Sequence, residues 1–173
     1  MGPFTELLSA DHRQTLEFFY VGLKDVSEPT VDYRELLYNA SVLANYAQIS
    51  TQTSVDVPTP ATLSTVFDSF FWDTTLVQDS RMMETAAAQC LLLTGFFEDQ
   101  LRGRHNIGWY ATLGAGFFSR AASQEPSLPK AHLLDTMAKT FEVWRRRYAT
   151  LSRDLHDQPY LLAAPLARDR RGA

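Results

Sequence analysis

This chain of 173 residues has a single cysteine, no long apolar run and no excess of positive charge. Its single cysteine, Cys90, cannot form an internal disulfide, and a thiolate zinc site needs more than one such ligand. No apolar stretch approaches the roughly 20 residues of a transmembrane helix, so we expect no membrane insertion. The formal net charge of -4 argues against bulk electrostatic binding of nucleic acid, and we expect no nucleic-acid partner.

The N-terminal residues lack the basic region and the following apolar run of a secretory signal, so a cytoplasmic location is expected. The length is typical of one domain, and a chain of this size buries roughly 70% of its unfolded surface without disulfides or metals. We therefore predict a single helical bundle domain over residues 1–160. A flexible tail is expected over residues 161–173, because this segment has little apolar surface to bury.

Apolar residues recur at three and four positions along most of the chain, which is the period of helices. Hairpin signals such as Asn-Gly or Asp-Gly between alternating segments are missing. The pattern predicts an all-α fold, a bundle of about six helices. We expect the fourth helix to be central, because it is the most apolar. The expected helices span residues 11–24, 32–49, 60–72, 79–97, 107–121 and 128–155.

Local signals refine several of these helices. Asp32, Asn106 and Ser127 each precede a helix and are expected to cap it. The run 145–147 places three arginines about 100° apart around the last helix, so we expect them to be solvated rather than to form one patch. The same helix carries apolar residues spaced alternately by three and four, which is typical of packed helices. This seam consists of Leu134, Met137, Phe141, Trp144, Tyr148, Leu151 and Leu155.

Motifs for known chemistries are missing from the sequence. It contains neither a phosphate-binding Walker loop nor the Gly-x-Ser-x-Gly turn of serine hydrolases. The histidines His12, His105, His132 and His156 include no pair spaced to bind zinc from one helix. Cys90 lies among alanines and leucines, where an unreactive core position is expected. We predict no catalytic residue, no metal site and no cofactor, and favour a protein that is not an enzyme.

Aromatic residues are abundant: they make up 12% of the chain, with 11 Phe, 7 Tyr and 3 Trp. Several occur as adjacent pairs, such as Trp109-Tyr110 and Phe117-Phe118. Neighbours on a helix diverge by about 100°, so burying both members requires a helix covered over a broad arc. Three explanations stay open, namely an aromatic core, a subunit interface and a pocket for an apolar ligand.

Glycines dilute the expected helix over residues 107–121. Gly108, Gly114 and Gly116 would each cost about 1 kcal/mol relative to alanine inside a helix. We therefore expect them to permit a close backbone approach by another helix.

The segment Ala87–Leu101, followed by Trp109–Gly114, resembles a stretch that recurs in a group of small, uncharacterised, all-helical bacterial proteins. In that group a helix ending in Gly-Leu-Phe-Pro-Glu precedes a second helix that is rich in tyrosine and contains glycine. This chain departs from the pattern at Phe97 and Glu98, where the group prefers Phe-Pro. The resemblance implies a bacterial source, and no activity, cofactor or site residue follows from it.

Two functions of different classes are consistent with these observations. The first is a non-enzymatic module that binds a protein partner and itself, as a homodimer. The second is a binding protein or enzyme that encloses a small hydrophobic or aromatic ligand between helices. The expected interface residues are Trp109, Tyr110, Phe117, Phe118, Trp144 and Tyr148. The expected pocket residues are Glu84, Gln89, Tyr110 and His132.

Overall fold

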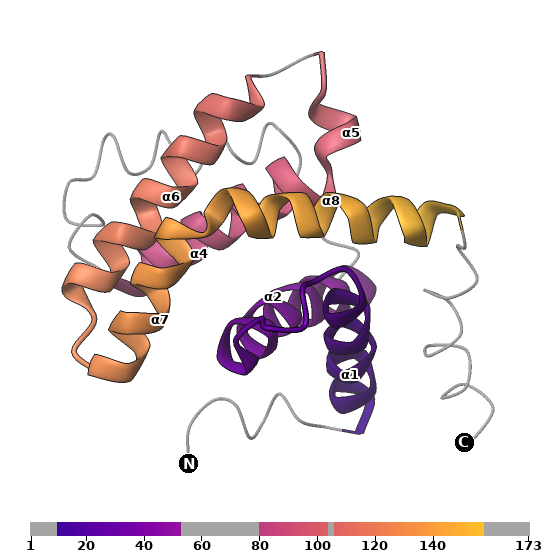
Figure 1. The fold of residues 1–173 in the computed structure, drawn as a ribbon, viewed down its shortest axis with the longest axis horizontal. Coiled ribbons are helices and arrows are strands. Elements are labelled where there is room, and N and C mark those ends of the chain that lie inside the picture. The colour runs from indigo at the N-terminus through magenta and orange to yellow at the C-terminus, as the bar shows by residue number, and fades with distance from the viewer. Residues whose placement is uncertain (1–9, 53–79, 104–105, 158–173) are drawn as a thin grey trace. The chain divides into compact units, whose positions relative to one another are not determined.

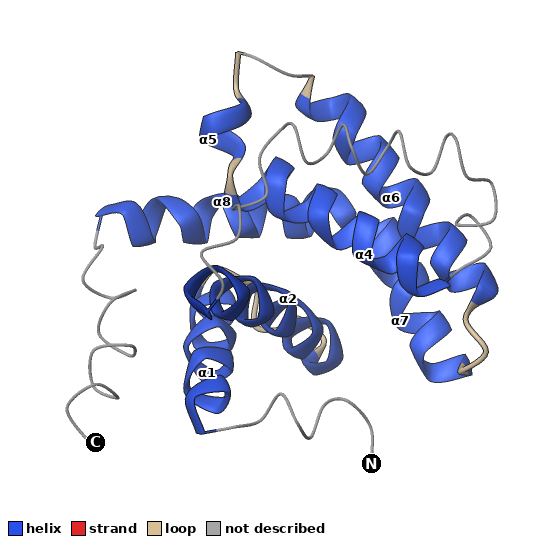
Figure 2. Ribbon diagram, turned by 180° about the vertical axis from the view of Figure 1, so that it is seen from behind, coloured by secondary structure: helices blue, strands red, loops and turns tan. Residues whose placement is uncertain are grey.

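The computed structural model describes residues 10–52, 80–103 and 106–157 (Figure 1). Within these ranges all regular elements are helical, as Figure 2 shows, which confirms the predicted all-α bundle. The predicted helix over residues 60–72 and the predicted tail lie outside the described residues, as does His105. The elements are α1 (Ala10–Asp25), α2 (Tyr33–Gln52), α4 (Ser80–Leu91), the π-helix η2 (Leu92–Phe96), α5 (Glu98–Leu101), α6 (Ile107–Gln124), α7 (Leu128–Lys139) and α8 (Phe141–Asp157).

The chain divides into two compact units. The first unit comprises residues 1–55 and 150–173, and the second unit comprises residues 56–149. The prediction of a single domain over residues 1–160 stays a prediction. None of the described helices is long and apolar enough to cross a membrane.

In the first unit, α1 packs along α2. The apolar residues Phe19 and Leu23 of α1 and Leu36 and Leu43 of α2 are buried, as the helical spacing requires. Asp32 caps α2 as predicted, because its carboxylate accepts a hydrogen bond of 2.7 Å from the backbone N–H of residue 34.

In the second unit, α6 packs along α4 on one side and along α7 on another. The predicted central helix is buried where expected, with Met83, Ala87 and Cys90 of α4 at most 1% exposed. Gly114 of α6 is packed so closely that an added Cβ would lie 2.7 Å from the Cβ of Cys90 and 2.6 Å from Phe141 Cζ. The expectation of a close backbone approach is therefore confirmed at Gly114. It is wrong at Gly108 and Gly116, where no other described helix lies within 4 Å of an added Cβ.

The predicted last helix is divided in two. α7 ends at Lys139 and α8 begins at Phe141, with Thr140 between them. The backbone angles of Thr140, φ -105° and ψ 14°, depart from those of an α-helix, although its hydroxyl and its backbone N–H both donate to the carbonyl of Thr136, at 2.7 and 2.9 Å. All seven residues of the predicted seam are nevertheless buried, at most 4% exposed. The seam is confirmed, whereas the unbroken helix is wrong.

The predicted caps of α6 and α7 differ in outcome. Asn106 caps α6, because its side-chain oxygen accepts a hydrogen bond of 3.0 Å from the backbone N–H of Trp109. Ser127 holds the capping position of α7 without a capping hydrogen bond from its side chain. The carboxylate of Glu125 instead accepts a bond of 3.2 Å from the backbone N–H of Ser127.

Candidate functional site

The outer face of α6 is the first candidate surface in the second unit. It is formed by Trp109, Thr112, Leu113, Gly116, Phe117 and Arg120, which line a hollow of about 280 Å³. We call these six residues the α6 outer face. Trp109 is 48% exposed, and an added Cβ at Gly116 would meet no atom of the described residues within 4 Å. The face is thus open at Gly116, two residues from the tightly packed Gly114.

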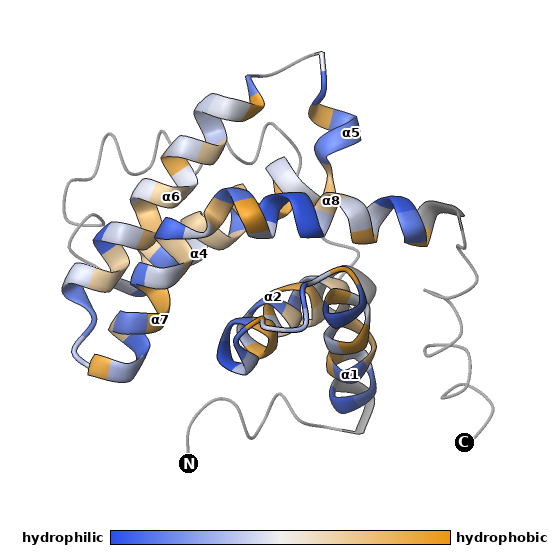
Figure 3. Ribbon diagram, in the orientation of Figure 1, coloured by the Kyte–Doolittle hydropathy of each residue, from blue (hydrophilic) through white to orange (hydrophobic). Residues whose placement is uncertain are grey.

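The composition of α6 is unusual for a helix with one side in water. Its 18 residues include a single charged side chain, Arg120. The middle of α6 lacks the strongly hydrophilic positions that α8 carries (Figure 3). Helices that are apolar around most of their circumference are generally covered on more than one side.

The predicted interface residues do not share one surface. Phe118, Trp144 and Tyr148 are 0% exposed, so a partner protein has no access to them in this structure. Their spacing on the helices places them on the inward faces, which explains the burial. Trp109 and Tyr110 are accessible in part, and their rings meet edge to face at 4.9 Å. Phe117 is 8% exposed and lines the hollow. Trp109, Tyr110 and Phe117 stay predicted interface residues.

The predicted pocket residues are dispersed over three helices. Glu84 of α4 forms an ion pair of 3.0 Å with Lys130 of α7. His132 is exposed on α7, and Tyr110 is half-buried on α6. Gln89 of α4 has a buried Oε1 atom that accepts no hydrogen bond from the described residues. None of these side chains lines the hollow on α6.

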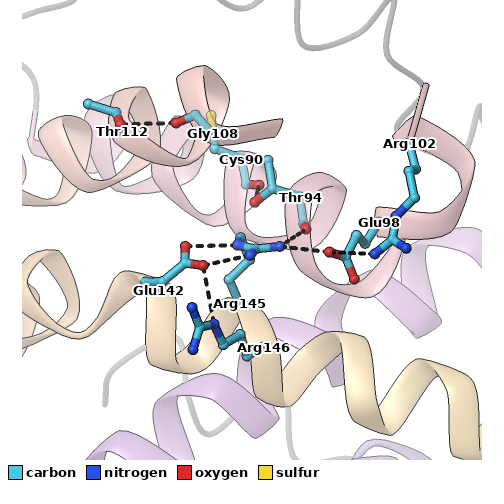
Figure 4. A network of polar contacts seen from close by, with 9 residues as sticks. All are labelled: Cys90, Thr94, Glu98, Arg102, Gly108, Thr112, Glu142, Arg145 and Arg146. Atoms are coloured by element: carbon cyan, nitrogen blue, oxygen red, sulfur yellow. Dashed lines mark hydrogen bonds and ion pairs between the residues drawn. The ribbon is translucent and has the colours of Figure 1, made fainter. Parts of the chain in front are cut away.

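A polar network around Arg145 is the second candidate site (Figure 4). The Arg145 side chain is only 12% exposed and donates to both oxygens of Glu142, at 2.9 and 2.6 Å. Its Nη1 atom also donates to Glu98 at 3.1 Å and to the carbonyl of Thr94 at 3.2 Å. Two more ion pairs complete the network: Arg102 pairs with Glu98 at 3.2 Å, and Arg146 pairs with Glu142 at 3.4 Å. The network joins α8 to α5 and η2.

The π-helix η2 lies directly against α8. An added Cβ at Gly95 would lie 2.8 Å from the Cβ of Tyr148 and 2.9 Å from the carbonyl oxygen of Arg145. The hydroxyl of Thr94 donates to the carbonyl of Cys90 at 2.6 Å, and the carbonyl of Thr94 accepts from Arg145. π-Helical turns leave the regular bonding pattern of the α-helix, so neighbouring side chains commonly bond their backbone groups.

The expectation that the three arginines of residues 145–147 are solvated is wrong at Arg145. Arg146 is 76% exposed, and the guanidinium of Arg147 lies 4.5 Å from the centre of the Trp144 ring. The three side chains do point apart, as the helical geometry requires. The spacing of Glu142 and Arg145 is a visible signal for their ion pair, whereas Glu98 lies 47 residues away in the sequence.

The network shifts the titration of its carboxylates. Burial alone would raise the pKa of Glu98, but hydrogen bonds from Arg145 and Arg102 outweigh it and lower that pKa below its ordinary 4.5. The hydrogen bond from Arg145 lowers the pKa of Glu142, against a smaller opposing effect of burial. The pKa of Arg145 is raised by its hydrogen bond to Glu142.

We predict that the Arg145 network loses its stabilising effect in acid. A carboxylate whose pKa is lower in the folded state stabilises it above the unfolded pKa and loses that contribution as the pH falls through the folded pKa. The free energy of unfolding of the native protein is expected to exceed that of Arg145→Met near neutrality, with a difference that shrinks below about pH 4. Urea unfolding of both proteins over this pH range measures the difference. A difference that is constant with pH would contradict the prediction.

The cysteine and the possible metal ligands are the remaining candidates for chemistry. Cys90 is buried, which confirms its predicted core position, and desolvation raises the pKa of its thiol to about 12, as expected for an unreactive thiol. Among the described residues, no three His, Cys, Asp or Glu side chains gather where they would hold a metal ion. The ionic groups of the Arg145 network bond one another and thus serve to join helices.

Comparisons of the chain with known protein families, with curated proteins and with solved structures find no match.

Proposed function

We propose that this chain is a non-enzymatic helical protein-interaction module that works as a homodimer through the α6 outer face. The proposal is based on one observation, a second row of residues along α6 that has the spacing of a helix contact. Trp109, Leu113, Gly116 and Arg120 follow one another at spacings of four, three and four residues, the pattern of helices that pack together. The buried seam of Ala111, Gly114, Phe118 and Ala121 has the same pattern on the inward side.

Two physical features support a protein partner at this face. The exposed Trp109 is of a residue type that is enriched at interfaces. The open space beside Gly116 allows a side chain of a partner helix to approach the α6 backbone. A bacterial cytoplasmic setting is part of the proposal, and its bacterial source is based on the sequence resemblance.

Native mass spectrometry of the freshly purified protein tests the proposed homodimer. The native chain is expected to give a dimer, and Leu113→Glu is expected to give a monomer, because it places a charge at the centre of the contact. Val143→Glu is the matched control, since Val143 is an exposed apolar residue of α8, at 47% exposure. A native chain that stays monomeric over a concentration series, or a dimer that survives Leu113→Glu with an intact fold, would contradict the proposal.

The hollow itself favours a second candidate function. Its volume of about 280 Å³ and its lining by Trp109, Leu113 and Phe117 suit a small hydrophobic or aromatic ligand. A monomer that carries an added mass in the same spectra would support this function, whether as a binding protein or as an enzyme. The identity of the compound would then indicate which of the two applies.

A further inference from the structure

We infer that the second copy lies antiparallel across the α6 outer face, so that Trp109 of each copy covers Arg120 of the other. The two-fold axis would pass level with Gly114 and Ala115. The inference rests on the proposed homodimer and adds its geometry and its reciprocal contacts. In a symmetric dimer with a two-fold axis, each pair of contacting residues occurs twice.

The α6 outer face complements itself when a second copy runs in the opposite direction. When the second copy is turned about a two-fold axis level with Gly114 and Ala115, Trp109 of one copy lies opposite Arg120 of the other. Leu113 then lies opposite Gly116. It also brings Thr112 opposite Phe117. The six residues that line the hollow are thus exchanged among themselves, with none left without a counterpart.

The two outer pairs, each of Trp109 with Arg120, place a cation against an aromatic ring. The face of an indole ring is electron-rich and attracts a guanidinium cation, and Trp is the most favourable ring for this contact. The same chemistry already occurs within the chain, where the Arg147 guanidinium lies 4.5 Å from the centre of the Trp144 ring. Arg120 is the only charge on α6, so the pair also gives that cation a favourable position at an otherwise apolar contact.

The central pairs are complementary in size. Leu113 would project over Gly116 of the second copy, where no atom of the described part of the chain lies within 4 Å of the Cβ position. Each copy therefore supplies one large side chain and one open space. Close packing at a helix contact requires this alternation of large and small residues.

A parallel arrangement in register does not satisfy the same residues. It would bring Arg120 against Arg120, where like charges repel, and Gly116 against Gly116, where a gap would remain. The antiparallel arrangement is therefore the one that the sequence of this face favours. A single helix face is smaller than the roughly 800 Å² per partner of stable complexes, so we expect a weak dimer that depends on concentration.

A charge exchange between two variants tests the antiparallel pairing. Trp109→Lys alone would place the introduced lysine against Arg120 twice, and Arg120→Glu alone would place the introduced glutamate against Trp109 twice. Each variant alone is expected to weaken self-association about tenfold. An equimolar mixture is expected to restore association, because the heterodimer pairs the introduced lysine with the introduced glutamate and keeps one native pair of Trp109 with Arg120. Sedimentation velocity over a concentration series measures all three samples.

A distance measurement checks the same geometry without changing the contact. A spin label on Ser123→Cys is specific, because the native Cys90 is buried. The rise of 1.5 Å per residue predicts that two labels lie about 25 Å apart in the antiparallel dimer and about 10 Å apart in a parallel one.

The possible outcomes separate the two proposals. A native dimer with restored association in the mixture and a long label distance supports the inference. A native dimer that Leu113→Glu disrupts, but with no restoration and a short label distance, overturns the antiparallel geometry and leaves the homodimer standing. A native chain that stays monomeric at every concentration overturns both.

Discussion

Replacing Arg145 with methionine is expected to lower the free energy of unfolding by about 3 kcal/mol, which is the cost of removing one partner from a buried ion pair. Glu98 and Arg145 are only 13% and 12% exposed, so water cannot fully replace the guanidinium. The substitution also removes the donor to the Thr94 carbonyl. Methionine retains most of the apolar stem of arginine, so lost packing contributes little. Urea unfolding measures the change.

The neighbouring arginine provides the matched control for this prediction. Arg146 is 76% exposed and its Nε atom lies 3.4 Å from Glu142, so Arg146→Met is expected to cost less than about 0.5 kcal/mol. Adding Glu98→Gln to Arg145→Met is expected to recover part of the loss, because it removes the buried charge that is left without its main partner. Equal losses for Arg145→Met and Arg146→Met would show that solvent screens both pairs alike.

The parts of the fold that follow from local physics were predictable from the sequence. The spacing of apolar residues such as Leu134, Trp144 and Leu155 identified the inward face of α7 and α8, and all three are buried. Asn106 was recognisable as a cap, because its side chain and the helix it precedes are adjacent in the sequence. Burial on one helical face depends on residues three or four positions apart, which a sequence displays directly.

The features that depend on contacts distant in sequence were not predictable. The pairing of Arg145 with Glu98 joins residues 47 positions apart, so Arg145 had the same local appearance as a solvated arginine. The division at Thr140 lies in the backbone angles of that residue, φ -105° and ψ 14°, which the apolar pattern does not report. The α6 outer face posed a similar difficulty, because aromatic abundance predicted an interface without showing that Phe118 faces inward and Trp109 outward.

The same substitution at two neighbouring glycines of α6 is expected to change stability in opposite directions. Gly114→Ala would place a Cβ 2.7 Å from the Cβ of Cys90, closer than real Cβ contacts, so packed helices must move apart. We expect a loss of about 1 to 3 kcal/mol in the free energy of unfolding. The Cβ of Gly116→Ala would have no atom of residues 10–52, 80–103 or 106–157 within 4 Å, so the substitution should raise stability by up to about 1 kcal/mol through helix propensity.

The comparison is informative because both substitutions add the same methyl group to one helix. Helix propensity alone would stabilise both variants alike, so any difference in sign reports the packing around Gly114. Urea unfolding at dilute protein concentration isolates this effect, since Gly116 also lies on the proposed dimer face. Stabilisation of Gly114→Ala would mean that α4 and α6 separate at little cost. The close packing of α4 on α6 would then not fix the position of the α6 outer face.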